Sequence, residues 1–288
     1  MITTLTLDDK TGAAVSLMTA DEKVLPTDLD GFFGIEAPRQ VKRPRPTGHG
    51  AINDTRYGDG RLMALAFECL GTDYGDTMTQ FRTVTAPMLQ TWDYGAALLK
   101  WTEATSGLTL QRLVRLDSDV TPHVDANSRM LLFQAQFFAE DPRAYSQTLT
   151  TVTGATLSAA SGGLTFAAPF NWKFTPSGGG TAACTNAGNR KTPPVIRIYG
   201  MAVNPQVLNV TTGDRISVTG TIAAGDYLEL DVVNRTAKLN GTTLRNNLID
   251  SASTTWWEMG SGTTNVRLLA STFDGTARAD VLFRSAYA

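Results

Sequence analysis

The sequence predicts a mainly β protein built from two modules, and three observations point to this. Residues 129–138, RMLLFQAQFF, alternate between core-facing and outward positions, which is the period-two pattern of a long strand with one buried side. The second half of the 288-residue chain consists of short alternating stretches separated by turn residues. Residues 151–190 are rich in Gly and Ser and poor in charge. We therefore expect two β domains, residues 1–148 and 149–288, with the Gly/Ser-rich segment leading into the second.

The strand at residues 129–138 runs into a turn that we interpret as the exit from the first domain. Pro142 cannot donate a hydrogen bond to a sheet, and it disfavours helical backbone at the residue before it. The carboxylate of Asp141 is expected to bond to the backbone near Arg143. We predict that Asp141, Pro142, Arg143 and Tyr145 form the hinge between the domains. The alternative is that they belong to the core of the first domain.

One helix is predicted in the first half, at residues 87–104. Its apolar residues at nearly helical spacing are Leu89, Trp92, Ala96 and Leu99. Pro87 suits a first helical turn, and Gly107 lies where a C-terminal glycine is expected. Gly95 weakens such a helix by about 1 kcal/mol relative to alanine, so a break there is the alternative.

Residues 37–60 are basic at first and rich in turn residues, which predicts a long extended loop or arm. A structureless stretch of that length in a compact domain is usually functional. Its basic run has too few charges and no interleaved aromatics for a nucleic-acid surface, and it suits an arm that meets acidic neighbours. The residues that we predict at a contact between subunits are Arg43, Arg45, His49, Arg56 and Tyr57.

The second half is predicted to be a β-meander. The expected strands are residues 194–199, 214–219, 226–233, 236–239, 266–270 and 277–283, with a further strand at residues 164–167. Asn240-Gly241 is the strongest short hairpin signal in the chain. Short strands with such regular turns favour a β-sandwich.

Two groups of carboxylates are candidates for chemistry, Glu140 with Asp141 and Asp226 with Glu229 and Asp231. Glu140 and Asp141 are adjacent, so they point in opposite directions from a strand end and make a poor acid–base pair. Glu229 and Asp231 share one strand face, with carboxylates within about 7 Å, which suits a metal or sugar contact. Nothing nearby completes a ligand set, so a solvated strand face is the favoured alternative.

The adjacent Trp256 and Trp257 must face in different directions in a strand. An exposed indole of this pair would stack on a sugar ring, whereas packing in the core is the favoured alternative. The sequence contains no GxSxG, HExxH, Walker A or GxGxxG motif. We therefore predict no catalytic residue, no metal site and no cofactor, and thus no enzyme.

Composition narrows the class of protein further. The hydrophobic fraction is 42% and the net charge is −2, which favours a folded core and predicts no nucleic-acid binding. Cys69 and Cys184 are too few for a disulfide framework, and two histidines are too few for a His-rich zinc site. No signal peptide and no apolar run long enough for a bilayer is recognisable, so we expect folding in a cytoplasm without membrane insertion.

The order of several stretches resembles the distal tail protein family of long-tailed, non-contractile bacteriophages. The first is the Pro- and Arg-rich loop that leads to Gly48-His49-Gly50, and the second is the strand that ends in Glu140-Asp141-Pro142-Arg143. The others are the stretch PVIRIYG at residues 194–200, the segment from Ala224 to Gly241, Trp256-Trp257 and the closing strand. Together they span nearly the whole chain.

This resemblance implies a fold and a function. The first domain is expected to be a β-sandwich with a helix and an arm, which forms a belt in a homohexameric ring at the distal end of a phage tail. The second is expected to be a galectin-like β-sandwich outside that ring. The implied partners are the tail tube protein, the tail-hub or tail-associated lysin protein, and receptor-binding or side-fibre proteins. The implied location is the virion tail tip, after assembly in the host cytoplasm.

Two other functions are alternatives. A carbohydrate-binding tail module would use Trp256 or Trp257, although a fold alone does not establish sugar binding. A cell-wall hydrolase would have only Glu140, Glu229 and Asp231 as candidate catalytic groups, and it lacks a motif.

Overall fold

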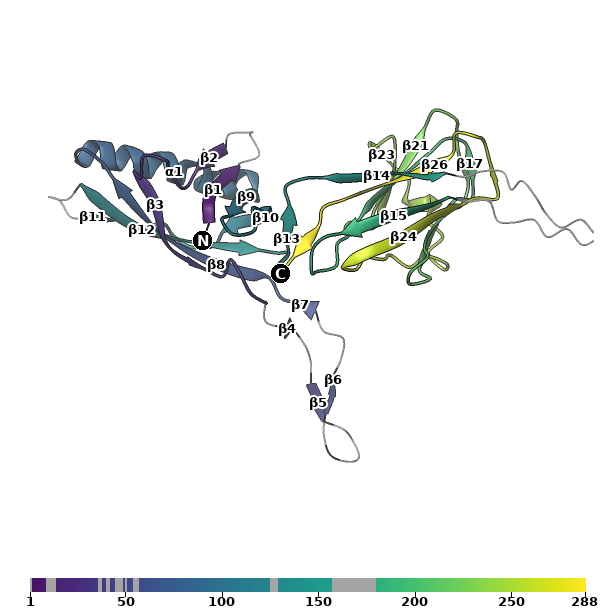
Figure 1. Cartoon of the computed structure of the whole chain (residues 1–288), viewed down its shortest axis with the longest axis horizontal. Helices are drawn as coiled ribbons and strands as arrows, with labels where there is room; N and C mark the ends of the chain where they lie inside the picture. The colour runs from purple at the N-terminus through teal and green to yellow at the C-terminus, as the bar shows by residue number, and fades with distance from the viewer. Residues whose placement is uncertain are drawn as a thin grey trace, which may run out of the picture. The chain divides into compact units, whose positions relative to one another are not determined.

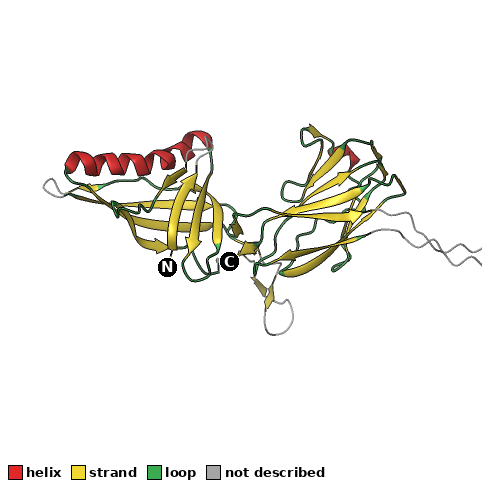
Figure 2. Ribbon diagram, turned by 45° about the horizontal axis from the view of Figure 1, so that its top comes forward, coloured by secondary structure: helices red, strands yellow, loops and turns green. Residues whose placement is uncertain are grey.

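The structure is a computed structural model, and it describes residues 2–8, 14–35, 38–39, 42–44, 49, 51–53, 57–124, 129–156 and 180–288. The chain divides into two compact units, one of Met1–Gln147 with Tyr287–Ala288 and one of Thr148–Ala286 (Figure 1). Within the described residues the protein is mainly β, with antiparallel sheets and one α-helix (Figure 2), which confirms the predicted fold class.

Ten described strands form the main sheet of the N-terminal unit, in the order β2-β1-β9-β10-β12-β8-β3, with β11, β13 and β27 off this path. They are β1 (Ile2–Asp8), β2 (Ala14–Ser16), β3 (Val24–Asp30), β8 (Arg61–Leu70), β9 (Ala97–Glu103), β10 (Thr109–Leu116), β11 (His123–Val124), β12 (Met130–Ala139), β13 (Ala144–Ser146) and β27 (Ala286–Tyr287). The longest ladder joins β8 to β12 over ten residue pairs, from Met130–Leu70 to Ala139–Arg61. The strand predicted at residues 129–138 is therefore confirmed.

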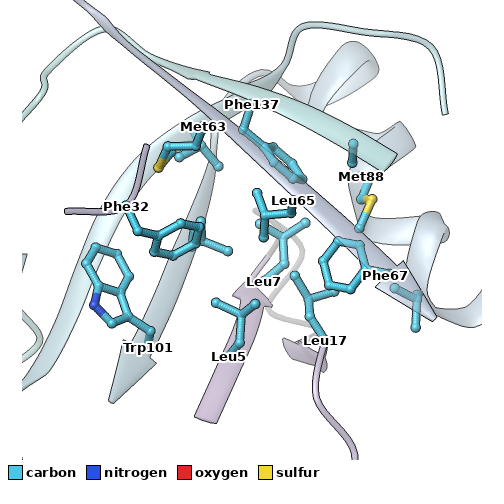
Figure 3. Close-up of a cluster of buried hydrophobic side chains, with 14 of the residues drawn as sticks. Leu5, Leu7, Leu17, Phe32, Met63, Leu65, Phe67, Met88, Trp101 and Phe137 are labelled. Carbon is cyan, nitrogen blue, oxygen red and sulfur yellow. The ribbon is translucent and has the colours of Figure 1, made fainter. Parts of the chain in front are cut away.

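The core of this unit lies between two halves of the sheet. Phe67 of β8 stacks on Phe133 of β12 with ring centroids 5.0 Å apart. Phe32 meets Trp101 of β9 edge to face at 5.3 Å. Figure 3 shows Leu5 and Leu7 of β1 in the same cluster as Phe32, Phe67 and Trp101. This face-to-face packing of apolar side chains is that of a β-sandwich.

The single α-helix of the described residues is α1 (Tyr74–Tyr94), so the prediction of a helix at residues 87–104 was wrong in its position. Asp73 caps the start by accepting a hydrogen bond from the Asp76 backbone N–H, and Gly95 ends the helix with φ 85°. Phe81 anchors the helix edge to face on Phe133 at 5.1 Å. Pro87 lies inside the helix rather than at its first turn.

The second half of the predicted helix is strand β9. Its buried residues, Ala97, Leu99 and Trp101, recur every second position, and Leu98 and Lys100 between them are less buried. Leu99 fits both a helical stripe and this alternation, so the spacing alone did not separate the two structures.

The predicted arm has backbone pairing of its own. β4 (Pro38–Arg39) pairs with β7 (Tyr57–Gly58), and β5 (Lys42–Pro44) pairs with β6 (Ala51–Asn53). Both ladders are separate from the main sheet (Figure 1). The described residues of the arm therefore form two short antiparallel ladders, which is more regular structure than the extended loop or arm that the sequence predicted.

Within its described residues, the C-terminal unit is a sandwich of a six-stranded and a four-stranded sheet, together with a small three-stranded sheet. The six strands are β14 (Thr150–Thr156), β26 (Arg278–Phe283), β16 (Val195–Tyr199), β21 (Tyr227–Asp231), β22 (Thr236–Leu239) and β23 (Thr243–Leu244). The four are β15 (Thr181–Asn186), β24 (Gly262–Leu269), β18 (Gln206–Asn209) and β19 (Arg215–Ser217), and the three are β20 (Thr221–Ile222), β17 (Ala202–Val203) and β25 (Thr272–Phe273). A short 3-10 helix, η1 (Asn246–Leu248), follows β23. Ile196 and Leu228 from one sheet and Val207 and Leu268 from the other are fully buried in one core.

The predicted hairpin at Asn240-Gly241 joins β22 to β23, where Leu239 pairs with Thr243. Asn240 has φ 52° and Gly241 has φ 71°, which is the left-handed backbone that favours these two residue types. This hairpin is confirmed. The strand predicted at residues 164–167 lies outside the described residues.

Candidate interaction surfaces

The arm carries a charge opposite to that of the rest of its unit. Residues 38–58 hold five Lys and Arg against one Asp, a net charge of +4. The remainder of residues 1–147 holds nine Lys and Arg against 18 Asp and Glu, a net charge of −9. Such a division favours an arm that meets the acidic body of another molecule.

The structure places the predicted contact residues only in part. Arg43 lies in β5 and Tyr57 lies in β7, and His49 is exposed. Arg45 and Arg56 lie outside the described residues. Their role at a contact between subunits stays a prediction.

A buried arginine, which no sequence pattern predicted, holds the segment that leads into the arm. Arg61, the first residue of β8, is 6% exposed. Its guanidinium donates one hydrogen bond to the carbonyl oxygen of Phe32, 3.1 Å away, and another to that of Gly34. The planar guanidinium fork suits two acceptors held side by side. The backbone from Phe32 to Gly34 is thus held from the interior of the unit.

A second buried arginine also contacts the backbone of the segment that leads into the arm. Arg112 of β10 is 1% exposed, and its guanidinium carbon lies 5.4 Å from the centroid of the Trp101 ring. Its nitrogens lie 3.5 Å from the carbonyl oxygens of Phe32 and Arg143. Arg112 therefore links the arm-side segment to the turn that contains the predicted hinge residues.

The predicted hinge residues form a network within the N-terminal unit. Asp141 accepts hydrogen bonds from the Arg143 side chain at 2.9 Å through both carboxylate oxygens and from the Tyr145 hydroxyl at 2.7 Å. Burial opposes ionisation of Asp141, but these bonds and the Arg143 charge outweigh it and hold the carboxyl pKa below its usual value. Ala144 between them is buried in the core. Both roles considered for this turn, hinge and core, remain open to test.

The other carboxylates that the sequence singled out each have a local partner. Glu140 forms an exposed ion pair with Arg115 at 3.4 Å, so it does not pair with Asp141. Glu229 accepts a hydrogen bond from Arg197 at 2.9 Å. Asp231 accepts one from the backbone N–H of Asn234 at 3.0 Å, which supports the turn between β21 and β22. Among the residues that the structure describes, no group of His, Cys, Asp and Glu is placed to hold a metal ion.

The two adjacent tryptophans differ in burial. Trp257 is 3% exposed and belongs to the core of the C-terminal unit, and Trp256 is half-buried against the same core. A sugar ring needs an open indole face, and Trp257 offers little of its surface. The burial favours the core-packing alternative for Trp257.

The six-stranded sheet carries a surface of tyrosine and arginine side chains that was not predicted from the sequence. Tyr199 and Tyr227 are cross-strand neighbours with ring centroids 5.2 Å apart. The guanidinium carbon of Arg278 lies 4.4 Å from the Tyr199 centroid, and that of Arg197 lies 5.6 Å from the Tyr227 centroid. Arg197 and Tyr199 lie two positions apart in β16 and so share a face, and the strand register brings Tyr227 and Arg278 to the same face.

Both cysteines are buried thiols. Burial raises the pKa of Cys69 and of Cys184 to about 11, so neither is a thiolate nucleophile near neutral pH. In the part of the chain that is described, no helix has the length and hydrophobicity of a membrane span.

Comparisons with known proteins show what this chain is similar to. The siphovirus-type tail component, C-terminal domain, matches residues 187–287. No curated protein sequence matches the chain. Among solved structures, the chain is similar to SPP1 Dit (gp 19.1), described as a paradigm of the hub adsorption apparatus in phages that infect Gram-positive bacteria. The identity is 11%, the TM-score is 0.67, and 99% of each chain is covered.

Two structures of the phage P2 baseplate in its activated conformation are also similar. The structure with Ca has a TM-score of 0.51 at 11% identity, and the structure with Sr has a TM-score of 0.50 at 12% identity; each match covers 97% of both chains. At these identities the structural likeness establishes the fold, and the family match comes from the sequence of the C-terminal unit. The C-terminal unit therefore matches the siphovirus-type tail component family over residues 187–287, and the whole chain shares the fold of SPP1 Dit.

Proposed function

We propose that this protein forms a ring, most simply of six copies, at the distal end of a phage tail, where it joins the tail tube to the tail-tip hub. Residues 1–148 form the ring in this proposal, and residues 149–288 lie on its outside. The observation that carries the proposal is the charge division of the N-terminal unit, +4 in the arm and −9 in the remainder. Association driven by such a division is steered by electrostatics and weakens with salt.

The arm is the element that contacts the neighbouring copy. Two arms of the same sign repel each other, so a symmetric arm-to-arm contact is disfavoured. A contact of the arm with the acidic body of the next copy is heterologous, and heterologous contacts that close on themselves make rings. Arg43, Arg45, His49, Arg56 and Tyr57 are the proposed contact residues.

The proposed partners follow from the proposed location of the ring at the distal end of the tail. One face of the ring contacts the tail tube protein, and the other contacts the tail-hub or tail-associated lysin protein. The C-terminal unit supports receptor-binding or side-fibre proteins. The role is structural and not enzymatic, and the site of action is the tail tip of the virion.

Light scattering after size exclusion, together with negative-stain images of the purified chain, tests this proposal. The expected result is a closed ring at low salt, with a mass of about six chains. Arg43→Glu with Arg45→Glu is expected to reduce the mass to that of one chain. A strict monomer at every protein concentration contradicts the proposal.

A further inference from the structure

Three large apolar side chains are exposed where the arm leaves the N-terminal unit. Ile35 is 83% exposed, Phe33 is 54% exposed and Leu62 is 50% exposed. Phe33 and Ile35 flank Gly34, whose carbonyl oxygen accepts a hydrogen bond from Arg61, the residue before Leu62. Single exposed apolar residues are ordinary, but a group of them at one place indicates an interaction site.

The backbone that carries these residues is fixed before any partner arrives. Phe32 is buried against Trp101, and Arg61 holds the carbonyl oxygens of Phe32 and Gly34. Gly31 adopts φ 77°, and a Cβ atom there would lie 2.2 Å from the carbonyl oxygen of Leu62, so the two segments are in close contact. A preorganised segment loses little conformational entropy on binding, which favours its use as an anchor.

Charge identifies the occupant of this surface. The arm with its net charge of +4 begins at Pro38, three positions after Ile35, and the remainder of the same unit has a net charge of −9. A second copy of the chain thus supplies an acidic body for the arm next to the apolar residues. We propose that Phe33, Ile35 and Leu62 are the apolar centre of the contact between copies of this chain.

This inference rests on the proposed ring and assigns the residues that hold its copies together. Interfaces commonly have an apolar centre, with aromatic residues among its anchors, inside a polar rim. In a contact between the arm of one copy and the acidic body of the next, the three residues at the base of the arm lie on the arm's side only. The contact is therefore heterologous, as a ring requires.

The test compares two double variants of the full chain. Phe33→Ser with Ile35→Ser removes the anchor, and Val233→Ser with Leu244→Ser is the matched control, because those residues are 64% and 56% exposed in the C-terminal unit. Molar mass is measured by light scattering over a range of protein concentrations. The anchor variant is expected to need at least about tenfold more protein to associate, which corresponds to 1.4 kcal/mol, and the control is expected to match the wild type.

The outcomes separate the inference from the proposed function. Thermal unfolding of both variants should match the wild type, because exposed substitutions change stability little. If the anchor variant unfolds early, the single variant Ile35→Glu at the most exposed position replaces it, with the same loss of association expected. An anchor variant that associates like the wild type overturns the inference and leaves the ring intact, including the case in which another tail component covers this surface. A wild type that is always monomeric overturns the proposed function and the inference with it.

Discussion

Arginine is used in opposite ways in the two units. Arg61 and Arg112 of the N-terminal unit are buried, and both guanidinium groups face backbone carbonyl oxygens, including that of Phe32. Arg197 and Arg278 of the C-terminal unit are partly exposed and lie over tyrosine rings on the face of a sheet. The buried guanidinium groups donate hydrogen bonds to backbone carbonyl oxygens of residues outside the strands. The surface guanidinium groups pack on tyrosine rings of a sheet whose strands already pair with one another. The shape of the N-terminal unit near the arm therefore depends on a few polar contacts.

The largest effect is expected for Arg112→Ala. The substitution leaves a cavity beside Trp101 and removes a donor from the carbonyl oxygens of Phe32 and Arg143, so it should lower the free energy of unfolding by about 3–5 kcal/mol. Scanning calorimetry should show a lower transition temperature for the N-terminal unit alone. Arg115→Ala on the same strand is the control, because that side chain is 54% exposed.

A smaller effect is expected for Arg143→Ala combined with Tyr145→Ala. Both side chains bond to Asp141 inside the N-terminal unit, so their loss should lower its free energy of unfolding by about 2 kcal/mol. Calorimetry measures this change. Unchanged transitions, together with a wider spread of inter-unit distances in X-ray scattering, would instead assign the pair to a hinge.

The pH dependence of Asp141→Asn isolates the charge in this network. The folded-state pKa of Asp141 is lowered, so its contribution is fully present above the unfolded carboxyl pKa of about 3.9 and is lost as the pH falls through the folded value. The Asn variant should be about 1–2 kcal/mol less stable at neutral pH. Urea unfolding from pH 7 downwards should show the difference shrinking in acid, and a constant difference would count against this account.

The smallest effect is expected for Arg197→Ala. The side chain pairs across strands with Glu229 and is 35% exposed, so its loss should cost less than about 1 kcal/mol. The transition of the C-terminal unit, followed by calorimetry, should hardly move. A drop as large as that of Arg112→Ala would show that the two units use arginine alike.

The elements that were predicted correctly are those that short-range sequence patterns determine. The strand at residues 129–138 and the hairpin at Asn240-Gly241 follow from alternation and from left-handed turn residues. The helix was misplaced because Leu99 satisfies two periods, and because packing of Phe81 on Phe133 determines where the helix lies. Burial of Arg61 depends on carbonyl oxygens some thirty positions earlier in the chain, which no local pattern contains.

One feature of the chain path bears on synthesis at the ribosome. Tyr287 packs on the N-terminal core, and β27 pairs with β13, so the N-terminal unit is completed by residues made after the whole C-terminal unit. The C-terminal unit is in this sense an insertion between two parts of the other. During translation, β13 of the N-terminal unit has no β27 to pair with until the ribosome has added about 140 further residues. A nascent chain thus acquires the last strand of its first unit only after its second unit has had time to fold.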